Sequence, residues 1–152
     1  MTDPIVFDST TPRFALPLLY AGQAQKEVFV NEALRLTDAL LHCTVAGTAA
    51  VPPTDPTEGD AWLVSAEASG EWMGNEDAIA LFQGGDWLLL TPRAGMSIYD
   101  IAAAQHRFFS GGWRKATLPV EPVGGSIVDA EARAVIADLV SALQALGIFP
   151  PA

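Results

Sequence analysis

Few side chains in this sequence are of the types that perform covalent catalysis. The histidines are His42 and His106, and the single cysteine is Cys43. Cys43 follows His42 directly, but a nucleophile and its base are recognised by their geometry in space and not by adjacency in the chain. The sequence contains no G-x-S-x-G elbow, no P-loop and no G-x-G-x-x-G motif. We therefore expect no enzymatic activity and no catalytic residue.

Two acidic clusters are of a type that could hold a hard cation. They are Asp55, Glu58 and Asp60, and then Asn75, Glu76 and Asp77. Neither cluster has the spacing of an EF-hand loop, and the glycines beside them are typical of ordinary turns. A glycosidase pair of carboxylates depends on a separation in space that the sequence does not supply. We expect no metal and no cofactor.

The four tryptophans all follow a glycine turn closely. The four units are Gly59-Asp60-Ala61-Trp62, Gly70-Glu71-Trp72, Gly85-Asp86-Trp87 and Gly112-Trp113. One interpretation is that the indoles fill a small β core and hydrogen-bond through their N–H groups. The other is that Trp72 or Trp113 is exposed and stacks on a sugar ring, since such a surface suits the apolar face of a sugar with polar groups at the rim. The polar groups would be Glu71, Asp77 and Arg114.

Residues 1–20 are predicted to form an extended N-terminal arm. Prolines at the density found there oppose both helix and central strand. The arm has too many apolar residues for a purely solvated tail, so we expect it to lie in a groove on its own core or on a neighbouring subunit. Its candidate contact residues are Phe7, Phe14 and Leu16.

A helix is predicted between residues 21 and 41, because apolar residues recur there with a helical period. The predicted apolar stripe is Phe29, Ala33, Leu36 and Leu40, and the opposite polar face is Gln25, Glu32, Arg35 and Asp38.

The segment after this helix is predicted to be β-structure. A connector rich in proline and glycine, residues 44–59, leads to short apolar runs separated by glycine turns. The best hairpin signals are Gly84-Gly85 and Gly111-Gly112, because primed two-residue turns need φ > 0, which glycine adopts without steric cost. Residues 21–118 should therefore form a helix with a small antiparallel sheet or partial barrel, and the fold class is α+β.

A second linker, residues 119–126, precedes a C-terminal helix predicted within residues 127–147, and residues 148–152 form a tail. Asp129 is a suitable N-cap and Gly147 a suitable C′ residue. The helix carries a heptad seam of Ala132, Ile136, Leu139, Leu143 and Leu146. An isolated helix of this length is marginal in water, so it must dock on its own sheet or on symmetry-related copies. Its four large seam residues join Phe7, Phe14 and Leu16 as candidates for an oligomer interface.

The composition favours association with other subunits. The 152 residues include 18 acidic and 8 basic side chains, and 17% are charged, where soluble domains average about 25%. A charge-poor surface predicts apolar area that other copies cover. The net charge of −10 disfavours nucleic acid and anionic membranes, which are held through Lys and Arg. We see no signal peptide and no membrane-spanning segment, and we expect synthesis in the cytoplasm.

Several motifs follow one another in a recognisable order. They are Leu18-Leu19-Tyr20-Ala21-Gly22-Gln23-Ala24-Gln25-Lys26-Glu27, Asn31-Glu32-Ala33-Leu34, Leu36-Thr37-Asp38-Ala39-Leu40, Gly70-Glu71-Trp72, Gly84-Gly85-Asp86-Trp87 and Phe109-Ser110-Gly111-Gly112-Trp113. In this order, over residues 15–147, they resemble an uncharacterised domain family of alphaproteobacterial prophage and gene-transfer-agent tail-fibre and head-spike proteins. The resemblance implies a virion component, and the family offers no catalytic residue to transfer.

Two functions follow as expectations. The first is a non-enzymatic structural component of a phage-like particle, a spike or fibre base or adaptor that oligomerises and attaches host-recognition proteins. Its partners would be further copies of itself and other virion structural proteins, and its final location the particle. The alternative is a carbohydrate-binding module that recognises host capsule or lipopolysaccharide through exposed tryptophans.

Overall fold

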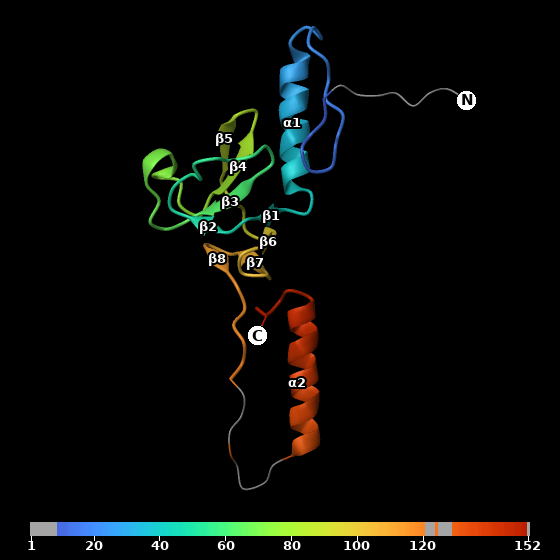
Figure 1. Ribbon diagram of the computed structural model, residues 1–152, viewed down its shortest axis with the longest axis vertical. Coiled ribbons are helices and arrows are strands. Elements are labelled where there is room, and N and C mark those ends of the chain that lie inside the picture. Colours follow the sequence, from blue (N-terminus) through green and yellow to red (C-terminus); the bar gives the residue numbers. More distant parts are fainter. Residues whose placement is uncertain (1–8, 121–123, 125–128, 152) are drawn as a thin grey trace, which may run out of the picture.

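The computed structural model describes residues 9–120, 124 and 129–151. Two helices flank two small β-sheets, which confirms the predicted α+β class (Figure 1). In chain order the elements are α1 (Lys26–Leu40), β1 (Thr44–Val45), β2 (Thr48–Ala49), β3 (Ala61–Val64), the 3-10 turn η1 (Gly70–Trp72), β4 (Ile79–Gln83), β5 (Asp86–Leu90), β6 (Ser97–Asp100), β7 (Gln105–Phe109), β8 (Trp113–Arg114) and α2 (Ala130–Ala145). The molecule is elongated, with α1 toward one end and α2 at the other (Figure 1).

The strands form two mixed sheets of four strands each. One has the order β2-β3-β4-β5 and the other β1-β6-β7-β8. In each sheet the first pair is parallel and the other pairs are antiparallel. The predicted single antiparallel sheet is therefore wrong in this respect, and neither sheet closes into a barrel. The parallel pair of β1 with β6 joins Thr44 to Tyr99, and no local sequence pattern reveals a pairing over that separation.

Both predicted glycine hairpins are present. Gly84 and Gly85 have φ of 68° and 81° and connect β4 to β5, whose residues pair in register from Gln83 with Asp86. Gly111 and Gly112 likewise have positive φ and connect β7 to β8, where Phe109 pairs with Trp113. The Glu58 carboxylate accepts hydrogen bonds from the N–H groups of Gly84 and Gly85 at 2.9 and 2.8 Å, which anchors the first hairpin to the connector.

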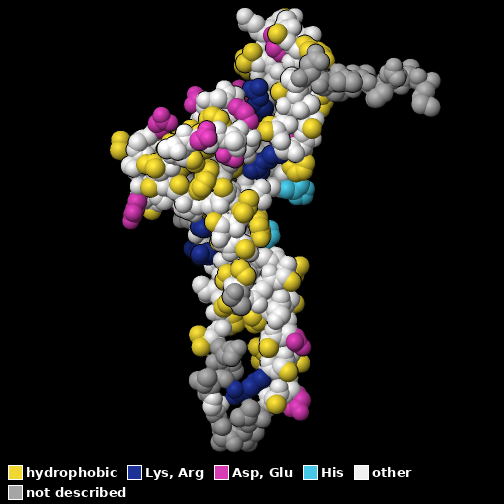
Figure 2. Space-filling view, in the orientation of Figure 1, with side chains coloured by type: hydrophobic (Ala, Val, Ile, Leu, Met, Phe, Trp, Pro, Cys, Tyr) yellow, Lys and Arg dark blue, Asp and Glu magenta, His cyan; other side chains and the backbone are white. Residues whose placement is uncertain are grey.

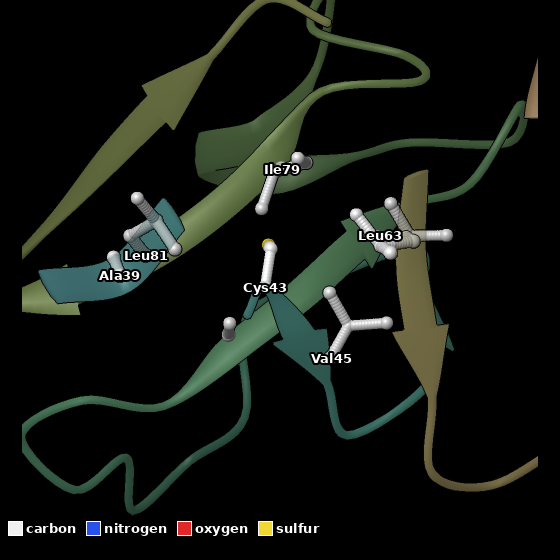
Figure 3. Packing of buried hydrophobic residues seen from close by; sticks show 8 residues of the cluster. Ala39, Cys43, Val45, Leu63, Ile79 and Leu81 are labelled. Atoms are coloured by element: carbon white, nitrogen blue, oxygen red, sulfur yellow. The ribbon is translucent and has the colours of Figure 1, made fainter. Parts of the chain in front are cut away.

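The main hydrophobic core lies where the two sheets and the C-terminal end of α1 meet. Its fully or nearly buried members are Ala39, Cys43, Val45, Ala61, Leu63, Ile79, Leu81 and Ile98. Figure 3 shows the Cys43 sulfur pointing toward Ile79, with Leu81 and Val45 on either side. Alternate residues of β3 and β4 face this core, as a period of two requires.

The opposite face of β3 and β4 covers a second cluster built around Trp72. Its buried members are Val64, Trp72, Ala78 and Ala80, and Trp62 and Trp87 pack at its margin. The rings of Trp72 and Trp87 meet edge to face at 5.1 Å and 89°, a geometry that aromatic quadrupoles favour. The sheet β2-β3-β4-β5 is thus buried on both faces around β4.

Helix α1 contacts the core only through its second half. Asp38 and Ala39 are buried there, and Leu36 and Leu40 pack against the core. The predicted apolar stripe is wrong at its start, because Phe29 is 75% exposed. The predicted polar face is wrong at Asp38, which is fully buried. Helical period alone does not show how far along its length a helix is covered.

The described part of the arm, residues 9–20, folds back as a narrow turn against α1 of its own chain. Thr10 and Pro17 form an antiparallel bridge, and the Thr11 N–H donates to the Leu16 carbonyl at 2.9 Å. At the other end of this segment the Asn31 side chain, on α1, exchanges hydrogen bonds with the N–H and C=O of Leu19 at 2.8 and 3.0 Å. The arm was expected to lie either on its own chain or on a neighbouring subunit, and residues 9–20 lie on their own chain.

Both predicted ends of α2 are confirmed. The Asp129 side chain accepts a hydrogen bond from the Ala132 N–H at 2.8 Å and caps the helix, and Gly147 follows its end with φ of 67°. The chain then returns to the second sheet, so that the C-terminal end of α2 lies beside β7 (Figure 1).

Candidate functional site

Helix α2 is an apolar element that the single chain leaves uncovered. None of its 16 residues has a buried side chain. Val135 is 67% exposed, Leu139 59% and Leu146, which follows the helix, 66%. Apolar side chains lie along the lower half of the molecule in Figure 2, over the helix that carries them. A helix that is apolar but uncovered is a typical sign of an interaction surface.

An apolar groove runs beside α2. It has a volume of about 690 Å³ and lies between the helix and residues 118–120 of the preceding segment. Ile136, Ala137 and Val140 form its helical side, and Leu118 and Val120 its other side. Val120 is 93% exposed. The groove lies on one side of α2, and the exposed Val135 and Leu139 lie on another, so apolar surface is present on two sides of the helix.

The C-terminal end of α2 is held to the second sheet by backbone and amide hydrogen bonds. The His106 N–H donates to the Gly147 carbonyl at 2.6 Å. The buried Gln105 side chain donates from Nε2 to the carbonyls of Ala116 and Ile148 at 3.0 and 3.2 Å. Gln105 therefore binds both the chain segment that precedes α2 and the chain segment that follows it.

The predicted interface residues fall into two groups. Ile136, Leu139 and Leu146 are exposed on or just after α2, and Leu143 is half-buried. Phe14, which is 46% exposed, and the half-buried Leu16 lie in the arm beside α1. The single chain does not bring the arm and the seam together, and Phe7 lies outside the described residues.

The predicted sugar-stacking residues are only partly available. Trp72 is fully buried, so the prediction that it is an exposed platform is wrong: η1 folds its ring inward onto small alanines. Trp113 is half-buried, and its indole N–H donates to the Asp77 carbonyl at 2.8 Å. Glu71 and Arg114 are exposed. The structure thus brings Trp113 to Asp77, but the contact is to the Asp77 backbone carbonyl and holds β8 to the loop before β4.

A buried polar cluster around Asp38 is the feature that sequence reasoning missed. Its carboxylate accepts from the Thr11 hydroxyl at 2.7 Å and from the N–H groups of Arg13 and Phe14 at 3.0 and 2.8 Å. The Arg13 guanidinium donates to the carbonyls of Gly59, Ala39 and Thr44 at 3.3, 3.2 and 2.7 Å. The cluster locks the arm, α1 and β1 together. The sequence holds no signal for it, since all partners but the Thr11 hydroxyl are backbone groups, and they lie far apart along the chain.

Two titratable groups have shifted pKa values with clear causes. Burial raises the pKa of the Cys43 thiol above its usual value of 9.0, partly opposed by the positive charge of Arg13. Hydrogen bonds from backbone N–H groups, first its own and also that of Gly22, lower the pKa of the Glu27 carboxyl. Both shifts belong to the structure of the fold, because Cys43 is a core residue and Glu27 lies in the first turn of α1.

Within residues 9–120, 124 and 129–151, no three His, Cys, Asp or Glu side chains converge in a way that would hold a metal ion. Over the same residues, neither helix combines the length and the apolar character needed to span a bilayer.

The fold and its surface define a small α+β protein with a covered two-sheet body and an uncovered apolar helix. The chain matches the family described as protein of unknown function (DUF2793) over residues 30–114, more than half its length, and it belongs to that family. The matched span is shorter than residues 15–147, the range of the motif order described above, and it excludes the arm and α2. No curated protein matches the chain.

Proposed function

We propose that this protein is a non-enzymatic structural component of a phage-like particle, a spike or fibre base or adaptor that assembles through α2. The observation that carries the proposal is the absence of any buried side chain along α2. The helix is attached at its C-terminal end and presents Val135, Leu139 and Leu146 to solvent. Its partner in the first instance is another copy of the same helix.

The energetics support assembly over a permanently solvated helix. Isolated helices of about 12–15 residues are marginal in water, and most helical stability in proteins comes from packing of an apolar face. Burying one large aliphatic side chain contributes about 1.5–3 kcal/mol. Packing of the exposed residues of α2 between copies would therefore stabilise both the helix and the assembly. Closed rings bury the same patch on every copy, which suits the symmetric bases of spikes and fibres.

The placement in a phage-like particle rests on the order of motifs from Leu18 to Trp113 described above. The low charge content, 17% of residues, fits a protein that is surrounded by other subunits. Attachment to other virion structural proteins would use apolar surface that self-assembly leaves open, such as the exposed Val28 and Phe29 on α1.

The assembly is tested by sedimentation equilibrium of the whole chain. We expect a discrete oligomer. The double variant Val135→Gln, Leu139→Gln should dissociate toward a 16.0 kDa monomer. The matched control is Glu131→Gln, Asp138→Gln, which places two glutamines on other exposed positions of the same helix and should leave the oligomer unchanged. A wild-type protein that remains monomeric at all concentrations would contradict the proposal.

The placement is tested separately by deleting the gene and examining purified particles by electron microscopy. We expect particles that lack a spike or fibre, restored by the wild-type gene and not by the Val135→Gln, Leu139→Gln variant. Particles with all appendages and an unchanged protein composition would remove the virion role while leaving the assembly measurement valid.

A further inference from the structure

A second surface feature lies where the C-terminal tail meets the second sheet. It is a pocket of about 270 Å³ lined by His106, Arg107, Arg114 and Lys115, with Phe108 and Ile148 as apolar walls. The whole chain has eight Lys and Arg residues and a net charge of −10. Three of those eight cations therefore line one small pocket. Figure 2 shows dark blue side chains gathered beside the junction of the body and the lower half.

Strand register explains why His106, Phe108 and Arg114 converge. Phe108 on β7 pairs directly with Ser97 on β6 and with Arg114 on β8, and directly paired residues project from the same face of a sheet. His106 lies two residues before Phe108 and therefore shares that face. The face thus carries an aromatic ring flanked by a hydroxyl, an imidazole and a guanidinium.

The C-terminal tail completes the pocket. The Gly147 carbonyl accepts the His106 N–H at 2.6 Å, and a Cβ on Gly147 would lie 3.0 Å from the Tyr99 ring, closer than an ordinary contact. This close approach places Ile148, 41% exposed, at the pocket wall. The pocket is built from one copy of the chain and does not depend on assembly.

Two of the cations have no anionic partner in the described part of the chain. Arg107 forms an ion pair with the buried Asp100. Arg114 and Lys115 are exposed, and neither forms a hydrogen bond or ion pair through its side chain with residues 9–120, 124 or 129–151. Unpaired cations that converge beside an exposed aromatic ring are suited to a ligand that carries both an anionic group and an apolar face.

We propose that this pocket binds a carboxylate-bearing sugar, such as a uronic acid unit of a polysaccharide. The carboxylate would contact Arg114 and Lys115, where charge-assisted hydrogen bonds form most strongly. The apolar face of the sugar ring would lie on Phe108, which is 49% exposed. A bare inorganic anion would use the cations and leave the ring and Ile148 uncovered. Of the residues predicted from sequence for sugar binding, only Arg114 belongs to this pocket.

Isothermal titration calorimetry on the full chain tests the assignment with sodium glucuronate and with a polyuronate. We expect saturable binding of both, no binding of glucose, and much weaker binding of inorganic phosphate. The variant Arg114→Gln, Lys115→Gln should weaken glucuronate binding at least about tenfold. Phe108→Ala should weaken glucuronate and leave phosphate unchanged. Arg93→Gln, which removes an exposed cation outside the pocket, is the control and should bind like wild type.

Each alternative result overturns the assignment. Equal binding of glucose would remove the role of the carboxylate, and equal binding of phosphate would remove the role of the ring. Loss of affinity in Arg93→Gln would show diffuse charge attraction. Binding of polyglutamate without polyuronate would assign the pocket to an acidic peptide. Phe108→Ala changes only a half-exposed side chain, so we expect the variant to keep its fold. Its near-ultraviolet circular dichroism spectrum and melting temperature, compared with those of the wild type, check this.

Discussion

The Thr11 hydroxyl donates a hydrogen bond at 2.7 Å to the carboxylate of Asp38, across 27 positions of the sequence. The same carboxylate accepts the N–H groups of Arg13 and Phe14, so one buried side chain on α1 fixes a whole turn of the arm. A buried carboxylate is tolerated because every one of these donors points at it.

Replacement of Asp38 should therefore release the arm. Asp38→Asn presents an amide N–H₂ group to donors that need an acceptor, and we expect the free energy of unfolding to fall by about 3 kcal/mol, measured by urea denaturation. Hydrogen exchange of residues 11–18 should accelerate. Asp55→Asn, at an exposed position, is the matched control and should change stability by less than about 0.5 kcal/mol. An unchanged urea midpoint for Asp38→Asn would contradict this role.

Trp72 should be a stability residue. Its ring is fully buried and packs edge to face on Trp87, so Trp72→Ala should cost about 3–5 kcal/mol. The neighbouring Met73→Ala, at a side chain that is 71% exposed, should cost little. Chemical denaturation followed by circular dichroism measures both. A small effect at Trp72 would show that the second cluster does not support the fold.

Cys43 should make stability depend on pH in the alkaline range. Burial raises its pKa in the folded protein, so the folded state keeps the thiol protonated while the unfolded chain releases the proton. The protonated thiol's contribution to the free energy of unfolding is complete below the unfolded pKa of 9.0. This contribution is lost as the pH rises through the higher pKa of the folded state. We expect a smaller decline of the unfolding free energy above pH 9.0 in Cys43→Ala than in wild type. Parallel declines in the two proteins would exclude the effect.

Gly147 should control how α2 is attached. An alanine there would have φ of 67° and a Cβ 3.0 Å from the Tyr99 ring, so the ring would have to shift in addition to the backbone strain. We expect Gly147→Ala to cost about 3 kcal/mol and to increase proteolysis at residues 146–149, where the chain leaves α2. At Gly95, with φ of 94° and no atom within 4 Å of a Cβ, alanine should cost about 1–2 kcal/mol from strain alone. Equal effects at both glycines would show that the contact with Tyr99 is unimportant.

Local signals predicted the elements whose stabilising contacts are themselves local. The N-cap at Asp129, the C′ glycine at position 147 and the turn at Gly84-Gly85 each depend on residues a few positions apart, and each is confirmed. The two parallel strand pairs depend on separations that a period-two pattern does not encode. The antiparallel prediction failed for that reason.

The candidate sites were predictable to different degrees. The heptad spacing indicated the apolar seam of α2. The single chain leaves Leu139 and Leu146 exposed, so the alternative that the seam docks on the chain's own sheet is wrong for these two residues. Glycine-then-tryptophan spacing did not distinguish the buried Trp72 from a surface ring, because burial depends on what η1 packs against. The cationic pocket was missed since Phe108 and Arg114 come together only through the register of β7 with β8, and Ile148 reaches them only through the return of the tail.

The return of the chain after α2 has a practical consequence for labelling. The His106 N–H binds the Gly147 carbonyl and the Gln144 side chain binds the Pro150 carbonyl, so the chain after α2 stays at the end of the helix that faces the sheets. The start of α2 lies at the other end of the helix, away from the sheets (Figure 1). A fluorophore attached through a cysteine at position 151 would report on the sheets. One at position 130 would report on whatever neighbour surrounds the projecting tip, so the two positions separate events at the body from events in the assembly.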